Sequence, residues 1–187
     1  MNNNTYKHSN IESLKKCIGK TFHSYQCDPF IYSNSVLGIV GFYIEDDYFA
    51  LHCNLEKNNR FFSTEEVSRL SFNECDKDSI ISYMDGGQLI NNPVEEEIVS
   101  IEIVNDCENV KHDDEIESFY STKGIIFHLK TGLEISFEVK TWFSEMITIN
   151  RGYHLVEKFK PIDDFLEEWE DIPGYTAYAE RSIETLD

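Results

Sequence analysis

The chain has 187 residues, and its 35 acidic against 16 basic side chains give a formal net charge of −19. This length is typical of one domain, so residues 1–187 are taken as a single unit with a flexible start at residues 1–8. A content of 41% hydrophobic residues suffices for a buried core and excludes a wholly disordered chain. The charge argues against direct binding to nucleic acid or to anionic membranes, because both would repel it.

The first predicted element is a short helix over residues 9–18. Ser9 and Glu12 have the spacing of a capping box, apolar residues share one face, and Gly19 is a natural stop. A weaker strand pattern follows over residues 21–32.

Alternating apolar residues over 40–44 and 49–53 predict a hairpin. If Asp46-Asp47 is its two-residue turn, all the apolar side chains of both strands point to one face. The opposing pairs are then Val40 with Cys53, Phe42 with Leu51 and Ile44 with Phe49.

A second hairpin is predicted from alternation over residues 125–129 and 133–139. A two-residue turn would mix its faces, whereas a three-residue loop over 130–132 keeps them apart, and Gly132 suits the left-handed last position of such a loop. The opposing pairs are then Leu129 with Leu133, Phe127 with Ile135 and Ile125 with Phe137. Further strands are predicted over residues 66–72, 97–105 and 145–150.

An amphipathic, acidic C-terminal helix is predicted after Pro161. Its apolar residues repeat at helical spacing, and they are Ile162, Phe165, Leu166 and Trp169. Residues 105–122 are expected to form a long acidic loop, and residues 175–187 a short helix or a loose tail. The predicted fold is α+β: a curved, mainly antiparallel β-sheet of about six to eight strands, with a short helix near each end.

The negative charge is concentrated in two stretches, because residues 1–60 carry six charges of each sign. Residues 95–117 contain ten acids and only Lys111, and residues 163–187 contain nine acids and only Arg181. Solvated charge runs are common, but solubility alone needs a net charge of only about 2–8. A surface for a basic partner is therefore expected. Two tyrosines beside the last acidic run either anchor this interface or pack the tail onto the sheet. The candidate partner-binding residues are Glu95, Glu96, Glu97, Asp113, Asp114, Glu115, Asp163, Asp164, Glu167, Glu168, Glu170, Asp171, Tyr175 and Tyr178.

Catalytic motifs are weak in this chain. Glu138-Val139-Lys140 has the spacing of metal-dependent nucleases, but no Pro-Asp precedes it, and both charged residues lie on the polar side of a predicted strand. The histidines are isolated, and no nucleotide-binding glycine motif is present. The expectation is a protein that is not an enzyme and has no cofactor or metal. A metal-dependent hydrolase using His112, Asp113 and Glu138 is the alternative from another class.

The five cysteines are odd in number, widely spaced and without a C-x-x-C pair, which is typical of reduced thiols in a cytoplasmic protein. The start of the chain is polar and has no signal-peptide pattern.

The chain resembles bacterial immunity proteins of contact-dependent growth inhibition and other polymorphic toxin systems in its size, its lack of a targeting pattern and its acidic stretches at 95–97, 113–115 and 163–171. This is a resemblance of type, without a shared motif. It implies stoichiometric binding to a basic nuclease toxin, whose nucleic-acid cleft the carboxylates would occupy or cover. A phosphate-mimicking inhibitor or regulator of another DNA- or RNA-binding protein is the alternative among binding proteins.

Overall fold

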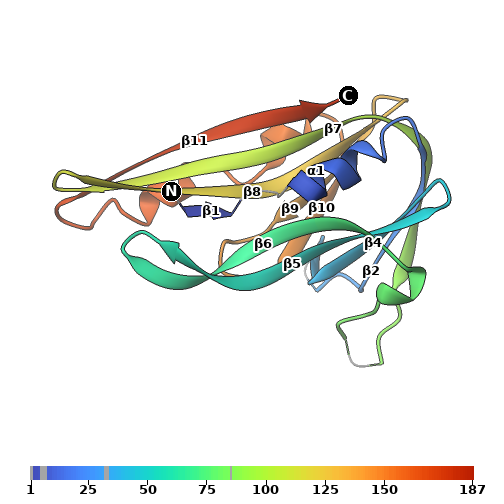
Figure 1. Cartoon of the computed structure of the whole chain (residues 1–187), viewed down its shortest axis with the longest axis horizontal. Coiled ribbons are helices and arrows are strands. Elements are labelled where there is room, and N and C mark those ends of the chain that lie inside the picture. Colours follow the sequence, from blue (N-terminus) through green and yellow to red (C-terminus); the bar gives the residue numbers. More distant parts are fainter. Residues whose placement is uncertain (1, 5–7, 32–33, 85) are drawn as a thin grey trace.

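The computed structural model describes residues 2–4, 8–31, 34–84 and 86–187. It shows an elongated molecule built on one open, strongly curved sheet of eleven strands with two short α-helices (Figure 1). The strand pairs of the described residues are antiparallel, except that β1 runs parallel to β8. The mainly antiparallel sheet is therefore confirmed, and the expected number of strands was too low. The strands are β1 Asn2–Asn4, β2 Thr21–Cys27, β3 Ser35–Leu37, β4 Ile39–Ile44, β5 Asp47–Arg60, β6 Ser63–Cys75, β7 Ile90–His112, β8 Glu115–Leu129, β9 Glu134–Val139, β10 Met146–Gly152 and β11 Tyr175–Leu186.

Four short helical segments complete the fold: α1 His8–Lys15, α2 Asp164–Glu167 and the 3₁₀ turns η1 Lys77–Ser79 and η2 Leu155–Lys158. The predicted N-terminal helix is confirmed, although it starts at His8 and ends three residues earlier than expected. The capping contact expected from the side chain of Ser9 lies outside the described part of the structure.

β7 organises the sheet, because its 23 residues pair with three different strands. Its first part pairs with β2, and the remainder lies between β8 and β11. The strand order is β3-β10-β9-β8-β7-β2-β4-β5-β6. In Figure 1, β11, β7 and β8 form one layer and β5 and β6 the other, and the two long hairpins reach the same end of the molecule.

The sheet bends back on itself at Gly38. This residue alone separates β3 from β4, which lie in different parts of the strand order. Its φ of 69° is in the left-handed region, and a Cβ there would lie 2.8 Å from the ring of Tyr83. Glycine is required at this bend for both reasons.

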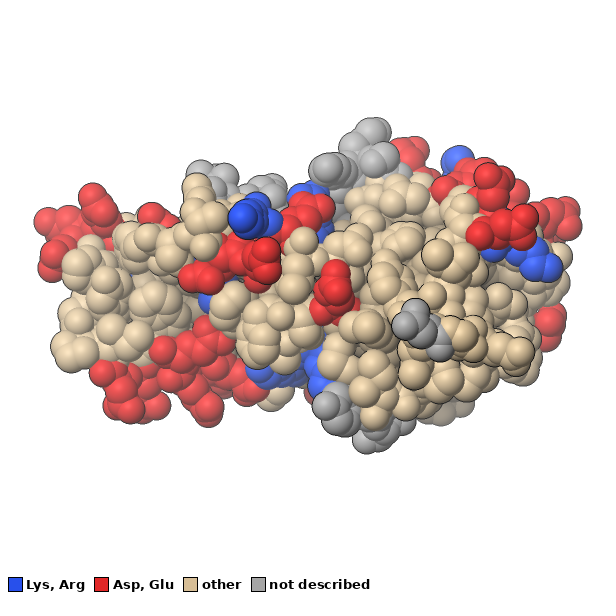
Figure 2. All heavy atoms as spheres, turned by 90° about the horizontal axis from the view of Figure 1, so that it is seen from below, with Lys and Arg blue, Asp and Glu red and all other residues tan. Residues whose placement is uncertain are grey.

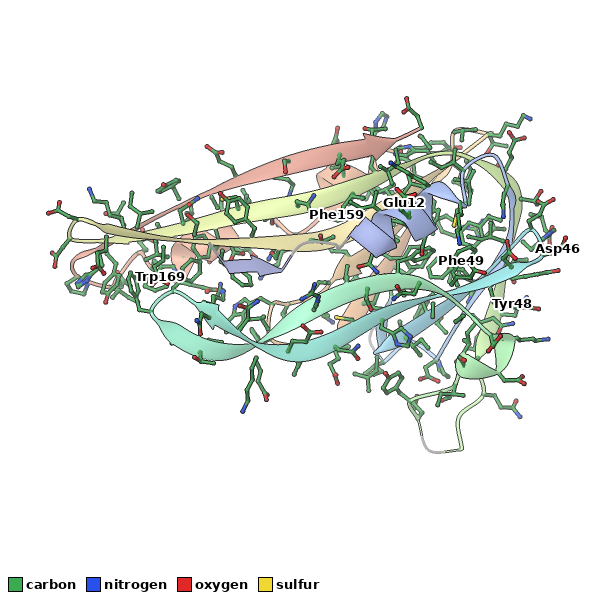
Figure 3. All side chains as sticks on the ribbon, in the orientation of Figure 1. Glu12, Asp46, Tyr48, Phe49, Phe159 and Trp169 are labelled. Atoms are coloured by element: carbon green, nitrogen blue, oxygen red, sulfur yellow. The ribbon has the colours of Figure 1, made fainter. Side chains whose placement is uncertain are left out.

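An aromatic core fills the inner face of the curved sheet. The ring centre of Phe42 lies 4.9 Å from that of Phe137 and 5.3 Å from that of Phe72. α1 packs on this core through Leu14, which is fully buried. In Figure 3, Phe49 lies in the half of the molecule that contains this aromatic core, and Trp169 lies at the opposite end.

The β8–β9 hairpin has the predicted register. Ile125 opposes Phe137 and Phe127 opposes Ile135. Gly132 ends the loop with a φ of 85°, and its N–H donates to the carbonyl of Leu129 at 2.8 Å. Both the loop length and the reason for the glycine are confirmed.

The β4–β5 hairpin forms, but its register differs from the predicted one by two residues. Phe42 opposes Phe49 rather than Leu51, and the turn residues are Glu45 and Asp46. Glu45 adopts the positive φ that such a turn requires, at 53°. A two-residue slip leaves every side chain on its original face, so burial patterning alone does not distinguish the two registers.

The predicted C-terminal helix is reduced to the four residues of α2. Like charges four residues apart, such as Asp163 with Glu167 and Asp164 with Glu168, disfavour a longer helix, and its last turn contains no basic residue. The predicted apolar face is nevertheless used, because Phe165 is buried and Leu166 and Trp169 pack beside it.

Two segments that were not expected to be strands form strands: residues 105–122 were expected to be a loop, and residues 175–187 a short helix or a loose tail. The supposed acidic loop, residues 105–122, is the outer half of the β7–β8 hairpin, which turns at Asp113-Asp114. The supposed tail forms β11, which pairs with β7 over twelve residues. The outer half of the β7–β8 hairpin was missed because its strands carry polar residues on both faces. In β11 the alternation is limited to Tyr175, Ala177 and Ala179, which is too short and too weakly apolar a pattern to predict a strand of twelve residues.

Candidate functional site

The structure brings two of the three predicted acidic stretches together. Tyr175 opposes His112 in the β11–β7 ladder, so the segment 163–174 that leads into β11 lies beside the β7–β8 turn. Figure 2 shows acidic side chains gathered at this end of the molecule, on the left. We call this surface the acidic end, and it consists of the acids of the β7–β8 turn and of the segment leading into β11, with the first residue of that strand: Asp113, Asp114, Glu115, Asp163, Asp164, Glu167, Glu168, Glu170, Asp171 and Tyr175.

A cluster of aromatic rings lies at the centre of the acidic end. The rings of His112 and Tyr175 are stacked with centres 4.3 Å apart, and the ring centre of Trp169 lies 5.3 Å from that of Tyr175. Phe62 joins them with its edge toward Tyr175, at 6.0 Å, and is 42% exposed. The other three rings are half-buried, and aromatic groups that are partly accessible and surrounded by polar residues are typical of the centre of a protein–protein interface.

Phe61 and Phe62 at the tip of the β5–β6 hairpin were missed by the sequence analysis. Both have positive φ, 46° and 65°, which bulky side chains rarely adopt. Packing offsets this strain, because the ring of Phe61 lies 5.4 Å from Phe165 and 5.6 Å from Trp169. The sequence feature that could have identified them is a pair of adjacent aromatic residues between two polar strands. Only the fold, however, brings this hairpin to the acidic end.

Most carboxylates of the acidic end are not neutralised within the described residues. Asp164 pairs with Lys160 at 3.3 Å and Glu168 with Arg60 at 3.3 Å. The other seven form no ion pair there, and they are Asp113, Asp114, Glu115, Asp163, Glu167, Glu170 and Asp171. Their negative potential is therefore available to a partner.

The remaining predicted site residues lie elsewhere. Glu95, Glu96 and Glu97 are near the opposite end of β7, where Glu97 pairs with Lys130 at 2.7 Å and Glu95 with His23 at 2.9 Å. Tyr178 opposes Asn109 on the other face of β11 from Tyr175, since side chains three residues apart on a strand point to opposite faces. Neither group belongs to the acidic end.

A second polar region, the ionic cleft, lies between the sheet and the segment that precedes α2. Arg60 and Lys123 both hold the buried Glu108, at 3.2 Å and 3.0 Å. Arg181 of β11 binds both oxygens of Asp106, at 2.8 Å and 2.9 Å. Burial by itself would raise the pKa of Glu108, but the two cations outweigh it and the pKa is lowered.

Glu138 also lines the ionic cleft, although the sequence placed it on the exposed polar face of its strand. The segment after η2 covers it, and the backbone N–H of Lys160 donates to its carboxylate at 2.7 Å. Burial raises the pKa of Glu138 to about 7, while this hydrogen bond and the charge of Arg181 act in the opposite direction. It therefore loses its proton near neutral pH.

The residues of the hydrolase alternative do not form one site. His112 and Asp113 lie at the tip of the β7–β8 hairpin, whereas Glu138 pairs with Gly124, roughly 30 Å further along β8. Within the described ranges, no three or more His, Cys, Asp or Glu side chains are grouped so as to hold a metal ion.

The cysteines carry no disulfide in the structure. Cys17, Cys27 and Cys53 are buried, and burial raises the pKa of the Cys17 and Cys53 thiols to about 12 and that of Cys27 to about 11. These groups remain protonated thiols at neutral pH.

The chain matches no protein-family model, no curated protein and no solved structure. In the part of the chain that the structure describes, no helix has the length and apolar character needed to span a membrane.

Proposed function

We propose that this protein captures a basic nuclease toxin and neutralises it in the cytoplasm of the cell that produces it, as immunity proteins do. The acidic end would face the nucleic-acid-binding cleft of the toxin, where its carboxylates take the place of phosphates. One observation carries the proposal: seven carboxylates without ion pairs lie around a half-buried aromatic cluster with an exposed Phe62, which three separate parts of the chain assemble.

The two components of this surface have different physical roles. Exposed carboxylates speed the encounter with a basic partner and disfavour acidic partners. The rings of Phe62, Trp169 and Tyr175 supply apolar area at the centre, which stabilises the complex after contact.

We expect the gene directly upstream to encode a large secreted protein, since toxin and immunity genes are expected to be neighbours, and the experiment uses the C-terminal domain of that protein. Degradation of RNA and of duplex DNA by this domain is followed with increasing amounts of the full chain. We expect inhibition to saturate at one chain per toxin domain.

A charge-reversed variant locates the contact surface. Glu167→Lys/Glu170→Lys/Asp171→Lys should weaken inhibition by about a hundredfold. Glu157→Lys/Glu184→Lys/Asp187→Lys changes the net charge equally at exposed positions outside the acidic end, and should stay within about threefold of the unmodified chain. Absence of inhibition contradicts the proposed function, and equal losses in both variants contradict the placement of the site.

A further inference from the structure

A shallow groove of about 450 Å³ runs along the acidic end between the α2 segment and the start of β11. Its walls are the rings of Trp169 and Tyr175 and the side chains of Leu166 and Ala177. Figure 3 shows Trp169 at this end of the molecule, remote from the Asp46 turn. An aromatic and aliphatic wall of this kind accepts the apolar stem or the flat face of a long side chain.

The rim of the groove is purely acidic. Its charged lining residues are Asp163, Glu167 and Glu170, and no lysine or arginine lines it. All three come from one short segment: Asp163 precedes α2, Glu167 ends it, and Glu170 lies in the turn that follows. None of them forms an ion pair within the described residues.

The ionic cleft provides the contrast within the same molecule. There the buried carboxylates of Asp106 and Glu108 are already occupied by Arg181, Lys123 and Arg60. Arg60 also stacks on the ring of Trp142, with its guanidinium carbon 4.0 Å from the ring centre. The chain thus satisfies one arrangement of carboxylates and aromatic rings with its own arginine, and leaves a second, open arrangement without a cation.

We infer that the groove receives an arginine side chain of the basic partner, with the guanidinium on the Trp169 and Tyr175 rings and its N–H groups donating to the rim carboxylates. This inference rests on the proposed function and specifies the partner's anchoring residue. Arginine fits better than lysine for two reasons. Its planar guanidinium stacks on aromatic faces, and its five N–H donors reach carboxylates that lie apart along the rim.

The test uses the isotope-labelled full chain and three peptides, Gly-Arg-Gly, Gly-Lys-Gly and Gly-citrulline-Gly. The NMR signal of the Trp169 indole ring C–H groups reports on the groove, and a Trp142→Phe variant distinguishes it from the other tryptophan. We expect the arginine peptide to shift this signal, the lysine peptide to bind at least about threefold more weakly, and the citrulline peptide, whose side chain is uncharged, not to bind.

Matched variants distinguish binding of the peptide in the groove from a general effect of the protein's net charge. Glu167→Gln/Glu170→Gln should weaken binding of the arginine peptide about tenfold, and Glu157→Gln/Glu184→Gln should leave it unchanged. Equal affinities for the arginine and lysine peptides, equal losses in both variants, or an unmoved Trp169 signal would overturn the inference.

The same variants distinguish failure of this inference from failure of the proposed function. If Glu167→Gln/Glu170→Gln inhibits the toxin domain as well as the unmodified chain does, the inference fails and the proposed function stands. If the arginine peptide occupies the groove but the toxin domain is not inhibited, the proposed function fails instead.

Discussion

Glu138 differs from the other carboxylates of the ionic cleft, because the nearby cations are already held by Asp106 and Glu108. It receives a backbone hydrogen bond from Lys160 but forms no ion pair within the described residues. A buried carboxylate in this position is costly when ionised, which is why burial dominates its raised pKa.

This arrangement makes the stability of the protein dependent on pH. In the unfolded chain a glutamate titrates near pH 4.3, whereas the pKa of Glu138 in the fold is about 7. The folded state therefore holds the proton more tightly, and the contribution of Glu138 to stability is lost as pH rises through this window. Relative to Glu138→Gln, the unmodified chain should lose about 3 kcal/mol between pH 5 and pH 8 in urea unfolding.

Glu157→Gln is the control for this prediction, because Glu157 is exposed. This variant should follow the unmodified chain at both pH values. If Glu138→Gln also shows the same pH dependence as the unmodified chain, the buried acid does not titrate in this range.

At the scale of elements, the conformation of the β8–β9 loop depends on one residue, Gly132. A Cβ at Gly132 would contact nothing within 4 Å, so any cost of a side chain there comes from the φ of 85° alone. Gly132→Ala should lower the free energy of unfolding by about 1 kcal/mol, and Gly132→Asn by less, because asparagine tolerates left-handed backbone. Equal costs for the two substitutions in chemical denaturation would show that backbone conformation is not the cause.

β11 is the second element whose role is testable. Its Arg181 neutralises the buried Asp106, and its Tyr175 and Ala177 pack on the apolar cluster below α2. Arg181→Ala should destabilise the fold by about 3 kcal/mol, because an uncompensated carboxylate stays buried.

Truncation after Gly174 should lower the melting temperature further or prevent folding, since it also removes the ladder with β7. Ser182→Ala, at an exposed position of the same strand, is the control and should be nearly neutral. If the truncated chain has the same melting temperature as the full chain, residues 175–187 are only a tail and do not stabilise the fold.

At the scale of the whole molecule, the charge of −19 has a defined distribution (Figure 2). The acids near Glu97 are largely partnered by nearby residues, whereas most of those at the acidic end are not. Long-range attraction of a basic partner should therefore come mainly from the acidic end.

The association rate with the upstream toxin domain should consequently fall by about tenfold or more as salt rises from 50 to 500 mM, because exposed charges are screened over about 8 Å at physiological ionic strength. Stopped-flow kinetics measures this rate, and the dissociation rate should change much less. A salt-independent association rate would remove the electrostatic role assigned to the acidic end.

Much of the fold could be predicted from patterns of residues that are close together in the sequence. The alternation over residues 125–139 and the glycine at 132 were sufficient for the exact register of β8–β9, because face patterning and turn chemistry agreed. In β4–β5 the same patterning left two registers that bury identical faces, and only the turn at Glu45-Asp46 in the folded molecule separates them.

The sequence by itself determined a mainly antiparallel fold and the location of the acidic stretches, since composition and hydrophobic period are local properties. Tertiary structure decided which stretches meet: β11 pairing brings residues 163–175 to the β7–β8 turn and leaves Glu95–Glu97 far away. It also decided the burial of Glu138 and the exposure of Phe62. Local hydrophobic patterning cannot predict the pairing of strands that carry polar residues on both faces. Which of their faces becomes buried depends on the segments that pack against them, and these segments are distant in the chain.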